Sequence, residues 1–191
     1  MTRYDDEIWA LVPEARNAPA EQLVRFVRAR GPAGRVLDLG CGDGRLTAEL
    51  DAEQLTAADV SEIALARARE RLPQARLVQL EPDQALPFED SEFDFVLCAE
   101  TLEHVRDVQL LLSELRRVLR PGGELAVTTP AHGRASGLGV LLQGFERSFD
   151  PLSPHLRFFS ARSLRRLLKE LGFDVRSLSR RSGTLLAVAT R

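Results

Sequence analysis

Three glycines follow a short apolar run in the sequence Val36-Leu37-Asp38-Leu39-Gly40-Cys41-Gly42-Asp43-Gly44. The apolar residues are typical of a buried strand, and glycines allow a tight turn in which the backbone comes close to a ligand. We expect residues 45–50 to open a helix whose free N–H groups face that ligand. The spacing is G-x-G-x-G, and Arg45 stands where a dinucleotide fingerprint needs its last glycine. The turn therefore predicts a nucleotide-like cofactor without the pyrophosphate of a dinucleotide.

A second apolar segment, residues 55–59, ends in the carboxylate of Asp59. Because the ends of adjacent parallel strands are neighbours, Asp59 is expected beside the glycine turn, where it can accept two hydrogen bonds from a ribose diol. The helix that starts at Ser61 leaves another interpretation open, in which Asp59 is only an acid stabilised by the helix dipole. The ribose interpretation is favoured because the glycine turn and the acid occur together.

Strand-like and helix-like segments alternate along the chain, which predicts a parallel sheet. The expected strands are residues 35–39, 55–59, 76–80, 93–98 and 124–129, and the expected helices are residues 20–30, 44–51, 61–72 and 107–120. Asp107 is the expected N-cap of the last of these helices, and Pro121-Gly122 its expected stop. A helix from Ser160 to Gly172 then precedes a hairpin of residues 173–179 and 184–189, so the final strand is expected to be antiparallel.

Five ordered motifs resemble those of the class I S-adenosylmethionine (SAM) dependent methyltransferases. They are residues 36–50, Asp59, residues 86–98, Leu102-Glu103-His104-Val105 and Leu119-Arg120-Pro121-Gly122-Gly123. The resemblance covers residues 20 to 130 closely. It implies a Rossmann-like, doubly wound α/β sheet of seven strands, mostly parallel with an antiparallel last strand. It also implies SAM as the cofactor and S-adenosyl-L-homocysteine (SAH) as its product.

The same resemblance assigns the cofactor-binding residues. The cofactor is expected over the glycine turn, with its ribose held by Asp59 and its adenine packed on Val60. The family often has an aspartate for the adenine amino group, and its place falls here on Pro82, so we assign this contact to the neighbouring Asp83. The full expected set is Asp38, Gly40, Cys41, Gly42, Asp59, Val60, Asp83 and Glu100.

Methyl transfer to a hydroxyl group benefits from a general base, whereas the sulfonium of SAM already activates the methyl group. His104 is the candidate, because it follows the fourth strand at the cofactor edge. His132 is the rival base. The run Glu100-Thr101-Leu102-Glu103-His104 is also similar to that of ubiquinone-biosynthesis O-methyltransferases, in which the two acids and the histidine can hold a divalent cation. We assign no metal site and leave that alternative open.

Residues 131–160 are the least regular segment, and we expect a lid that selects the methyl acceptor. Its expected apolar wall consists of Leu138, Val140, Leu141, Leu142, Phe145 and Phe149. A nucleic-acid acceptor is not expected, because Cys98-Ala99-Glu100-Thr101 stands where adenine methyltransferases have an Asn/Asp-Pro-Pro-aromatic segment. The expected acceptor is therefore a hydroxyl group of a small molecule.

The distribution of charge leaves other functions open. Residues 81–107 carry nine acidic residues and one arginine, whereas residues 155–181 carry eight lysines or arginines and two acidic residues. The basic part can serve as an RNA or protein face, either in a methyltransferase for such acceptors or in a SAM-binding regulatory or partner-dependent subunit. An NAD-dependent oxidoreductase is disfavoured by Arg45 and by the terminal hairpin.

Composition is that of one folded domain, residues 1–191, with 44% hydrophobic residues and a net charge of -2. There is no apolar run of about 18 residues and no signal peptide, so we expect a cytoplasmic protein without a membrane span. Cys41 and Cys98 lack metal-ligand spacing and are expected to be buried thiols. The sequence leaves the oligomeric state open.

Overall fold

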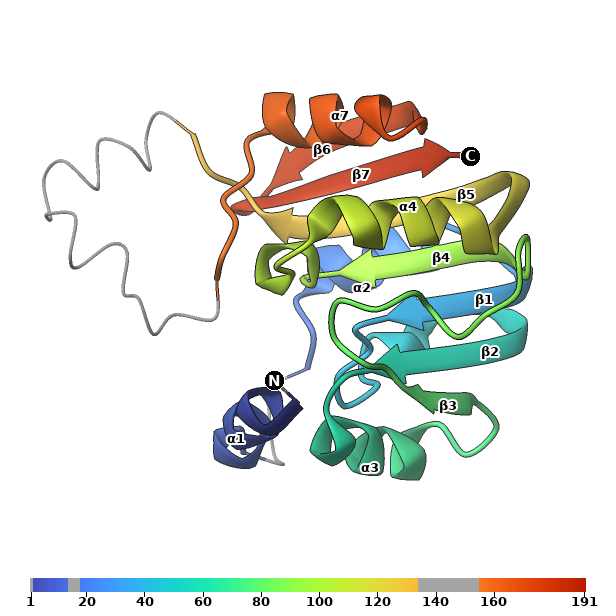
Figure 1. The fold of residues 1–191 in the computed structure, drawn as a ribbon, viewed down its shortest axis with the longest axis vertical. Coiled ribbons are helices and arrows are strands. Elements are labelled where there is room, and N and C mark those ends of the chain that lie inside the picture. The colour runs from blue at the N-terminus through green and yellow to red at the C-terminus, as the bar shows by residue number, and fades with distance from the viewer. Residues whose placement is uncertain (1, 14–17, 134–154) are drawn as a thin grey trace, which may run out of the picture.

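A seven-stranded sheet forms the centre of the computed structural model, which describes residues 2–13, 18–133 and 155–191. The strands are β1 (Ala33–Leu39), β2 (Ala52–Asp59), β3 (Arg76–Gln79), β4 (Phe93–Ala99), β5 (Leu119–Pro130), β6 (Asp174–Arg181) and β7 (Thr184–Thr190). Their order across the sheet is β3-β2-β1-β4-β5-β7-β6 (Figure 1). The first five strands pair in parallel, and β7 runs antiparallel to both β5 and β6. The expected sheet with an antiparallel last strand is confirmed.

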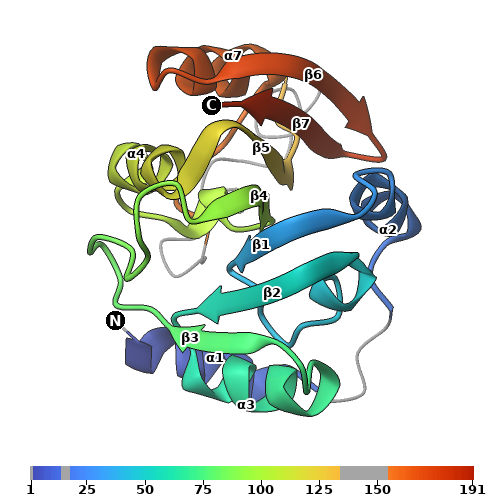
Figure 2. The same ribbon diagram turned by 90° about the vertical axis from the view of Figure 1, so that its right-hand side faces the viewer.

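Helices cover both faces of this sheet (Figure 2). They are α1 (Thr2–Leu11), α2 (Glu21–Arg28), α3 (Glu62–Arg71), α4 (Val108–Val118) and α7 (Ala161–Glu170), with the short 3₁₀ helices η1 (Thr47–Glu49) and η2 (Leu102–His104). The helices α4 and α7 pack on one face, and α2 and α3 pack on the other. The structure is therefore the doubly wound α/β fold that the motifs predict.

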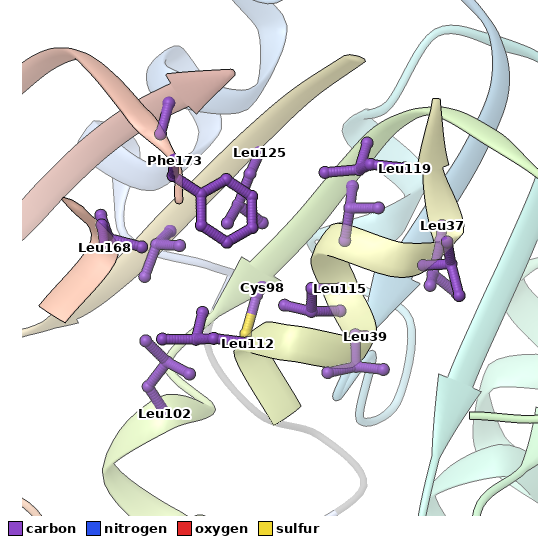
Figure 3. Packing of buried hydrophobic residues seen from close by; sticks show 14 of the residues in the cluster. Leu37, Leu39, Cys98, Leu102, Leu112, Leu115, Leu119, Leu125, Leu168 and Phe173 are labelled. Carbon is purple, nitrogen blue, oxygen red and sulfur yellow. The ribbon is translucent and has the colours of Figure 1, made fainter. Parts of the chain in front are cut away.

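The largest buried cluster lies between the sheet and the helices α4 and α7 (Figure 3). Leu112 and Leu115 of α4 and Leu168 of α7 are fully buried there. Successive side chains of a strand point to opposite faces, so Leu37 enters this cluster while Val36 packs with Val27 of α2. Both faces of β1 are covered, which explains its continuous apolar run.

Two expected helix boundaries are wrong. The expected helix over residues 44–51 is only the three-residue η1, because β2 already begins at Ala52 and leaves too little chain for a regular helix. No regular helix N-terminus therefore faces the glycine turn from this segment. The helix expected over residues 107–120 ends at Val118, since Leu119 is extended and pairs with Phe93 in the sheet, and Pro121-Gly122 lies within β5. Its N-cap is confirmed, because the Asp107 carboxylate accepts from two backbone N–H groups.

The expected lid lies mostly outside the described residues, which include only its two ends, residues 131–133 and 155–160. Its whole apolar wall falls in the undescribed part. The two ends meet, because Ala131 bridges to Phe159 and the backbone N–H of His132 donates to the Phe159 carbonyl at 2.7 Å. Among the described residues, no helix has the length and apolar content needed to cross a membrane.

Candidate cofactor and active site

The glycine turn leaves β1 at its carboxyl end, as the sequence predicts. Gly40, Gly42 and Gly44 all have positive φ values, of 76°, 54° and 76°. Other residues rarely adopt this conformation, so the path of the turn depends on glycine. A Cβ atom at Gly42 would lie 2.7 Å from the ring of Trp9, and this position therefore also has no room for a side chain.

Asp59 lies beside this turn, at the end of β2. Its Oδ2 accepts from the backbone N–H of Gly42 at 2.8 Å, and its Oδ1 accepts from that of Ser61 at 2.9 Å. The residue is 8% exposed, and this burial raises the pKa of its carboxyl group. The two hydrogen bonds lower the pKa and so offset part of this effect. Each carboxylate oxygen can accept more than one hydrogen bond, so Asp59 keeps the capacity to bind hydroxyl groups of a ribose.

Asp38 is buried beneath the turn. It is 3% exposed, its Oδ2 accepts from the hydroxyl of Thr47 at 2.6 Å, and burial raises its pKa to about 7. Cys41 is also buried, and burial raises the pKa of its thiol, as it does for Cys98. Both cysteines are therefore buried thiols, as expected, and neither is set up as a nucleophile.

The residues assigned to the adenine lie farther along the same edge. Val60 is partly buried against the main core. Asp83 has a positive φ of 56°, and its Oδ2 accepts from Nε of Arg106 at 2.9 Å. The carboxylate of Asp83 is thus already engaged by a cation. Its contact with an adenine amino group stays a prediction, since it would have to be made alongside this ion pair.

Glu100 and Glu103 are tied to β5 by two adjacent threonines. The hydroxyl of Thr128 donates to Oε1 of Glu100 at 2.8 Å, and that of Thr129 donates to Oε2 of Glu103 at 2.9 Å. Burial raises the pKa of both carboxyl groups. The Glu103 side chain is 2% exposed, and its backbone carbonyl accepts from the N–H groups of Leu156 and Arg157. Glu103 therefore anchors η2 to β5 and to residues 155–157.

The three histidines of the chain gather at this edge. The rings of His104 and His155 are 4.9 Å apart, and the ring of His132 is 5.0 Å from that of Phe158. Partial burial lowers the pKa of both His132 and His155. The positive charge of Arg180 lowers the pKa of His132 further. The pKa of His155 is lowered further by the neighbouring His104 and His132. The proximity of His155 to His104 has no signal in the sequence, because it depends on how the chain returns to η2.

One group of side chains has the composition of a metal site. Glu103, His104 and His155 each offer a ligand atom, and these atoms lie within 4.8 Å of one another. Imidazole and carboxylate groups are ligands for zinc and similar cations, which bind at about 2.0 to 2.2 Å. Oε1 of Glu103 and Nε2 of His104 are 4.0 Å apart, so the ligands would have to close around an ion. Glu100, the third ligand considered from the sequence, does not belong to this group.

The described residues fit a cofactor such as SAM. A Cβ atom at Gly40, Gly42 or Gly44 would meet the side chain of Thr101, Trp9 or Leu72, so the backbone of the turn comes close to its neighbours. Burial raises the pKa of Asp38 and Asp59 because it penalises their charged forms. A positively charged ligand beside them would stabilise those charged forms. These carboxylates therefore suit a cationic ligand that also carries hydroxyl donors.

Two surface hollows among the described residues differ in their place on the sheet, since the first borders the glycine turn and the second lies at the opposite edge. One, of about 640 Å³, is lined by Asp43 and the outer side of α3, and one of about 470 Å³ lies where β1 and β4 begin. Their walls carry arginines and acids, such as Arg67 with Glu70 and Arg120 with Asp94. The turn glycines, Asp59 and the histidines line neither hollow.

Residues 12–178 match a family model described as a methyltransferase domain. The chain is 40% identical over 136 residues to a trans-aconitate 2-methyltransferase of Variovorax paradoxus, an alignment covering 67% of this chain and 47% of that protein. It is 36% identical over 119 residues to a ubiquinone/menaquinone biosynthesis C-methyltransferase of Shewanella frigidimarina, covering 56% of this chain and 47% of that protein. The chain spans about half the length of these curated relatives.

A solved structure agrees with these sequence matches at the level of the fold. The crystal structure of an S-adenosylmethionine dependent methyltransferase from Mesorhizobium loti superposes with a TM-score of 0.69, at 20% identity, over 94% of this chain and 100% of that one. The family model, the curated relatives and the fold lead to the same assignment as the ordered motifs. The chain belongs to the class I SAM-dependent methyltransferases.

Proposed function

We propose that this chain transfers the methyl group of SAM to a hydroxyl oxygen of a small molecule, with His104 as the general base. The observation that carries the proposal is that His104, which follows β4, lies at the edge of the sheet where the neighbouring parallel strands β1 and β2 end in the glycine turn and Asp59, with the ring of His155 4.9 Å away. When bound, SAM supplies a methyl group activated by a sulfonium. The protein then has to hold the acceptor in line and remove its proton.

Each group has a role that its position supports. The glycine turn and Asp59 bind and orient the cofactor, and Asp38 fixes the turn from below through Thr47. The side chain of His104 is 39% exposed, so an acceptor can reach it, and the carboxylate of Glu103 lies 4.0 Å from its Nε2. A neutral His104 accepts the hydroxyl proton at a ring nitrogen, and the nearby carboxylate stabilises the imidazolium that results.

The test is the turnover of His104→Ala. We expect its turnover number to fall by about 10² to 10⁴ with unchanged affinity for SAM, because a positioned base contributes on that order. His132→Ala is the matched control, since it removes the rival imidazole. If His104→Ala turns over at the normal rate, His104 has only a structural role and its assignment as the general base is wrong.

A metal-dependent reaction gives a different pattern. A chelator would silence the enzyme, an added divalent cation would restore it, and His155→Ala would then be as damaging as His104→Ala. If the general base acts alone, chelation leaves the rate unchanged.

The acceptor atom needs its own experiment, because the two relatives differ: one is a trans-aconitate 2-methyltransferase and the other is a C-methyltransferase. SAH release should be measured with phenols, aliphatic alcohols and carboxylic acids of similar size. We expect the hydroxyl compounds to be methylated. Turnover of carboxylic acids alone would move the acceptor to a carboxyl oxygen, which needs no general base at neutral pH.

A second candidate is a partner-dependent or RNA-directed methyltransferase that uses the basic C-terminal part. Arg162, Arg165 and Arg166 are exposed on α7, which favours an acidic partner. Ion pairs of Arg166 with Glu170 and of Arg176 with Asp174 offset part of this charge. Salt-dependent RNA binding that is lost in Arg162→Gln and Arg165→Gln would support this function, and its absence leaves the small-molecule acceptor.

A further inference from the structure

A distant segment of the chain returns to η2 and brings a second imidazole beside His104. The backbone N–H groups of Leu156 and Arg157 donate to the Glu103 carbonyl at 2.7 and 3.0 Å. The guanidinium of Arg157 donates to two further backbone carbonyls just after η2. These contacts fix the preceding residue, His155, next to η2, and its ring centre is 4.9 Å from that of His104.

The carboxylate of Glu103 completes this group. One ligand atom from each of Glu103, His104 and His155 lies within 4.8 Å of the other two. Oε2 of Glu103 accepts from the hydroxyl of Thr129 at 2.9 Å, whereas its Oε1 lies 4.0 Å from Nε2 of His104. One carboxylate oxygen is thus anchored to β5 while the other faces the imidazole. An outer hydrogen bond of this kind holds metal ligands in place in many proteins.

The group combines a fixed anion with two reachable imidazoles. Zinc takes ligands at about 2.0 to 2.2 Å, so the ligand atoms of a tetrahedral site are about 3.4 Å apart. The side chain of Glu103 is 2% exposed and that of His104 is 39% exposed, and His155 is half-buried. An ion can therefore enter from solvent, and small rotations of the two histidine side chains close the group around it.

The ligand types select the metal. Two imidazoles and one carboxylate are a set that binds zinc and leaves a fourth position open. Magnesium and calcium prefer oxygen ligands alone, so this group does not suit them. A second carboxylate is absent from the group, because Glu100 accepts from the hydroxyl of Thr128 and is not among the clustered residues. The geometry therefore differs from the site of two acids and one histidine considered from the sequence.

We propose that Glu103, His104 and His155 bind zinc or a chemically similar transition-metal cation, and that the bound ion inhibits methyl transfer. The inhibitory part rests on the proposed function, since it takes His104 as the general base. A neutral imidazole has a single free lone pair, and a bond to the metal uses it. Metal-bound His104 cannot accept the hydroxyl proton, so the ion is a reversible inhibitor whose removal frees the base.

The first test measures metal binding without catalysis. Zn²⁺ alone is titrated by calorimetry into the full chain after treatment with a chelator, and Co²⁺ is added separately to record the visible absorption of a tetrahedral complex. We expect one ion per chain. His155→Gln should weaken Zn²⁺ binding by at least about tenfold, since even groups that only support a ligand contribute about 10- to 100-fold to metal affinity. The matched control is His132→Gln, which removes an imidazole outside the group and should bind as the wild type does. Absence of binding and of the Co²⁺ spectrum, or equal affinity of His155→Gln and wild type, would overturn the site.

The second test measures inhibition. SAH release with a hydroxyl acceptor is followed over rising Zn²⁺, and each variant is compared with its own metal-free rate. We expect the wild-type rate to fall at the Zn²⁺ concentration where calorimetry shows binding and to recover with a chelator, and the half-inhibitory concentration to rise by at least about tenfold in His155→Gln but not in His132→Gln. Faster turnover with Zn²⁺, or inhibition that is unshifted in His155→Gln, would overturn the inhibitory role. A wild type that binds Zn²⁺ but turns over no hydroxyl acceptor when metal-free would keep the site and overturn the proposed function.

Discussion

At the scale of single residues, Asp59 links the glycine turn to the start of α3. It accepts from the Ser61 N–H just before α3, as a helix-terminal acid does, and it also accepts from the Gly42 N–H of the glycine turn. The turn and the carboxylate are therefore one unit rather than two neighbouring features. A ligand that bonds to Asp59 is held at a fixed position relative to the glycines.

This unit makes Asp59→Asn an informative variant. We expect the affinity for SAM and SAH to fall by roughly tenfold to a hundredfold, because hydrogen bonds to a charged acceptor contribute about 1.5 to 3 kcal/mol. Calorimetry measures the loss, and Glu62→Gln, which removes an exposed acid three residues along the chain, is the matched control. Unchanged affinity in Asp59→Asn would remove the ribose assignment.

At the scale of elements, the packing of α3 on the turn positions the site. Gly44 has a φ of 76°, and a Cβ atom there would lie 2.8 Å from Cδ1 of Leu72 and 3.4 Å from Cβ of Ala68. The absent side chain lets α3 approach the turn closely. This approach places Ser61, and with it the contacts of Asp59 and Asp6, next to the glycines.

Gly44→Ala tests this packing. We expect a loss of unfolding free energy of about 1 to 3 kcal/mol from overpacking, beyond the cost of the positive φ. Gly122→Ala measures that backbone cost alone, because Gly122 has a φ of 75° and nothing within 4 Å of its would-be Cβ. Denaturant unfolding of both variants gives the difference. Equal losses would mean that the approach of α3 does not depend on Gly44.

At the scale of the whole molecule, buried carboxyl groups link stability to pH. Asp38 has a pKa of about 7 in the folded chain against an ordinary value of 3.8, because it is buried. Between these two values the folded state binds more protons than the unfolded state, so this residue lowers stability as pH rises. The partly buried His132 and His155 act in the opposite sense, since partial burial lowers the pKa of both.

Comparison with Asp38→Asn isolates the contribution of Asp38. The carboxamide oxygen can still accept from Thr47, but it does not ionise. The measured quantity is the melting temperature of Asp38→Asn minus that of the wild type. We expect this difference to rise steadily from about pH 4 to about pH 7, whatever its value at low pH. A difference that is independent of pH would show that Asp38 ionises normally in the folded chain.

The sequence by itself determined the order of the elements and the place of the cofactor turn. Both depend on local features: the apolar runs of the strands, the glycines after β1 and the N-cap at Asp107. The prediction from the sequence was wrong where a neighbouring element prevents a segment from adopting its locally preferred structure. The residues after Gly44 favour a helix, but the start of β2 at Ala52 limits them to a 3₁₀ turn.

Only the tertiary structure decided which distant residues lie together at the candidate site. Trp9 on Gly42, Arg106 on Asp83 and His155 beside His104 join parts of the chain that carry no shared motif. These contacts follow from the parallel sheet, which brings the carboxyl ends of β1, β2 and β4 to one edge, and from the attachments of α1 and of residues 155–157 to that edge. Residue spacing records distances along the chain, whereas the chemistry of the site depends on distances through space.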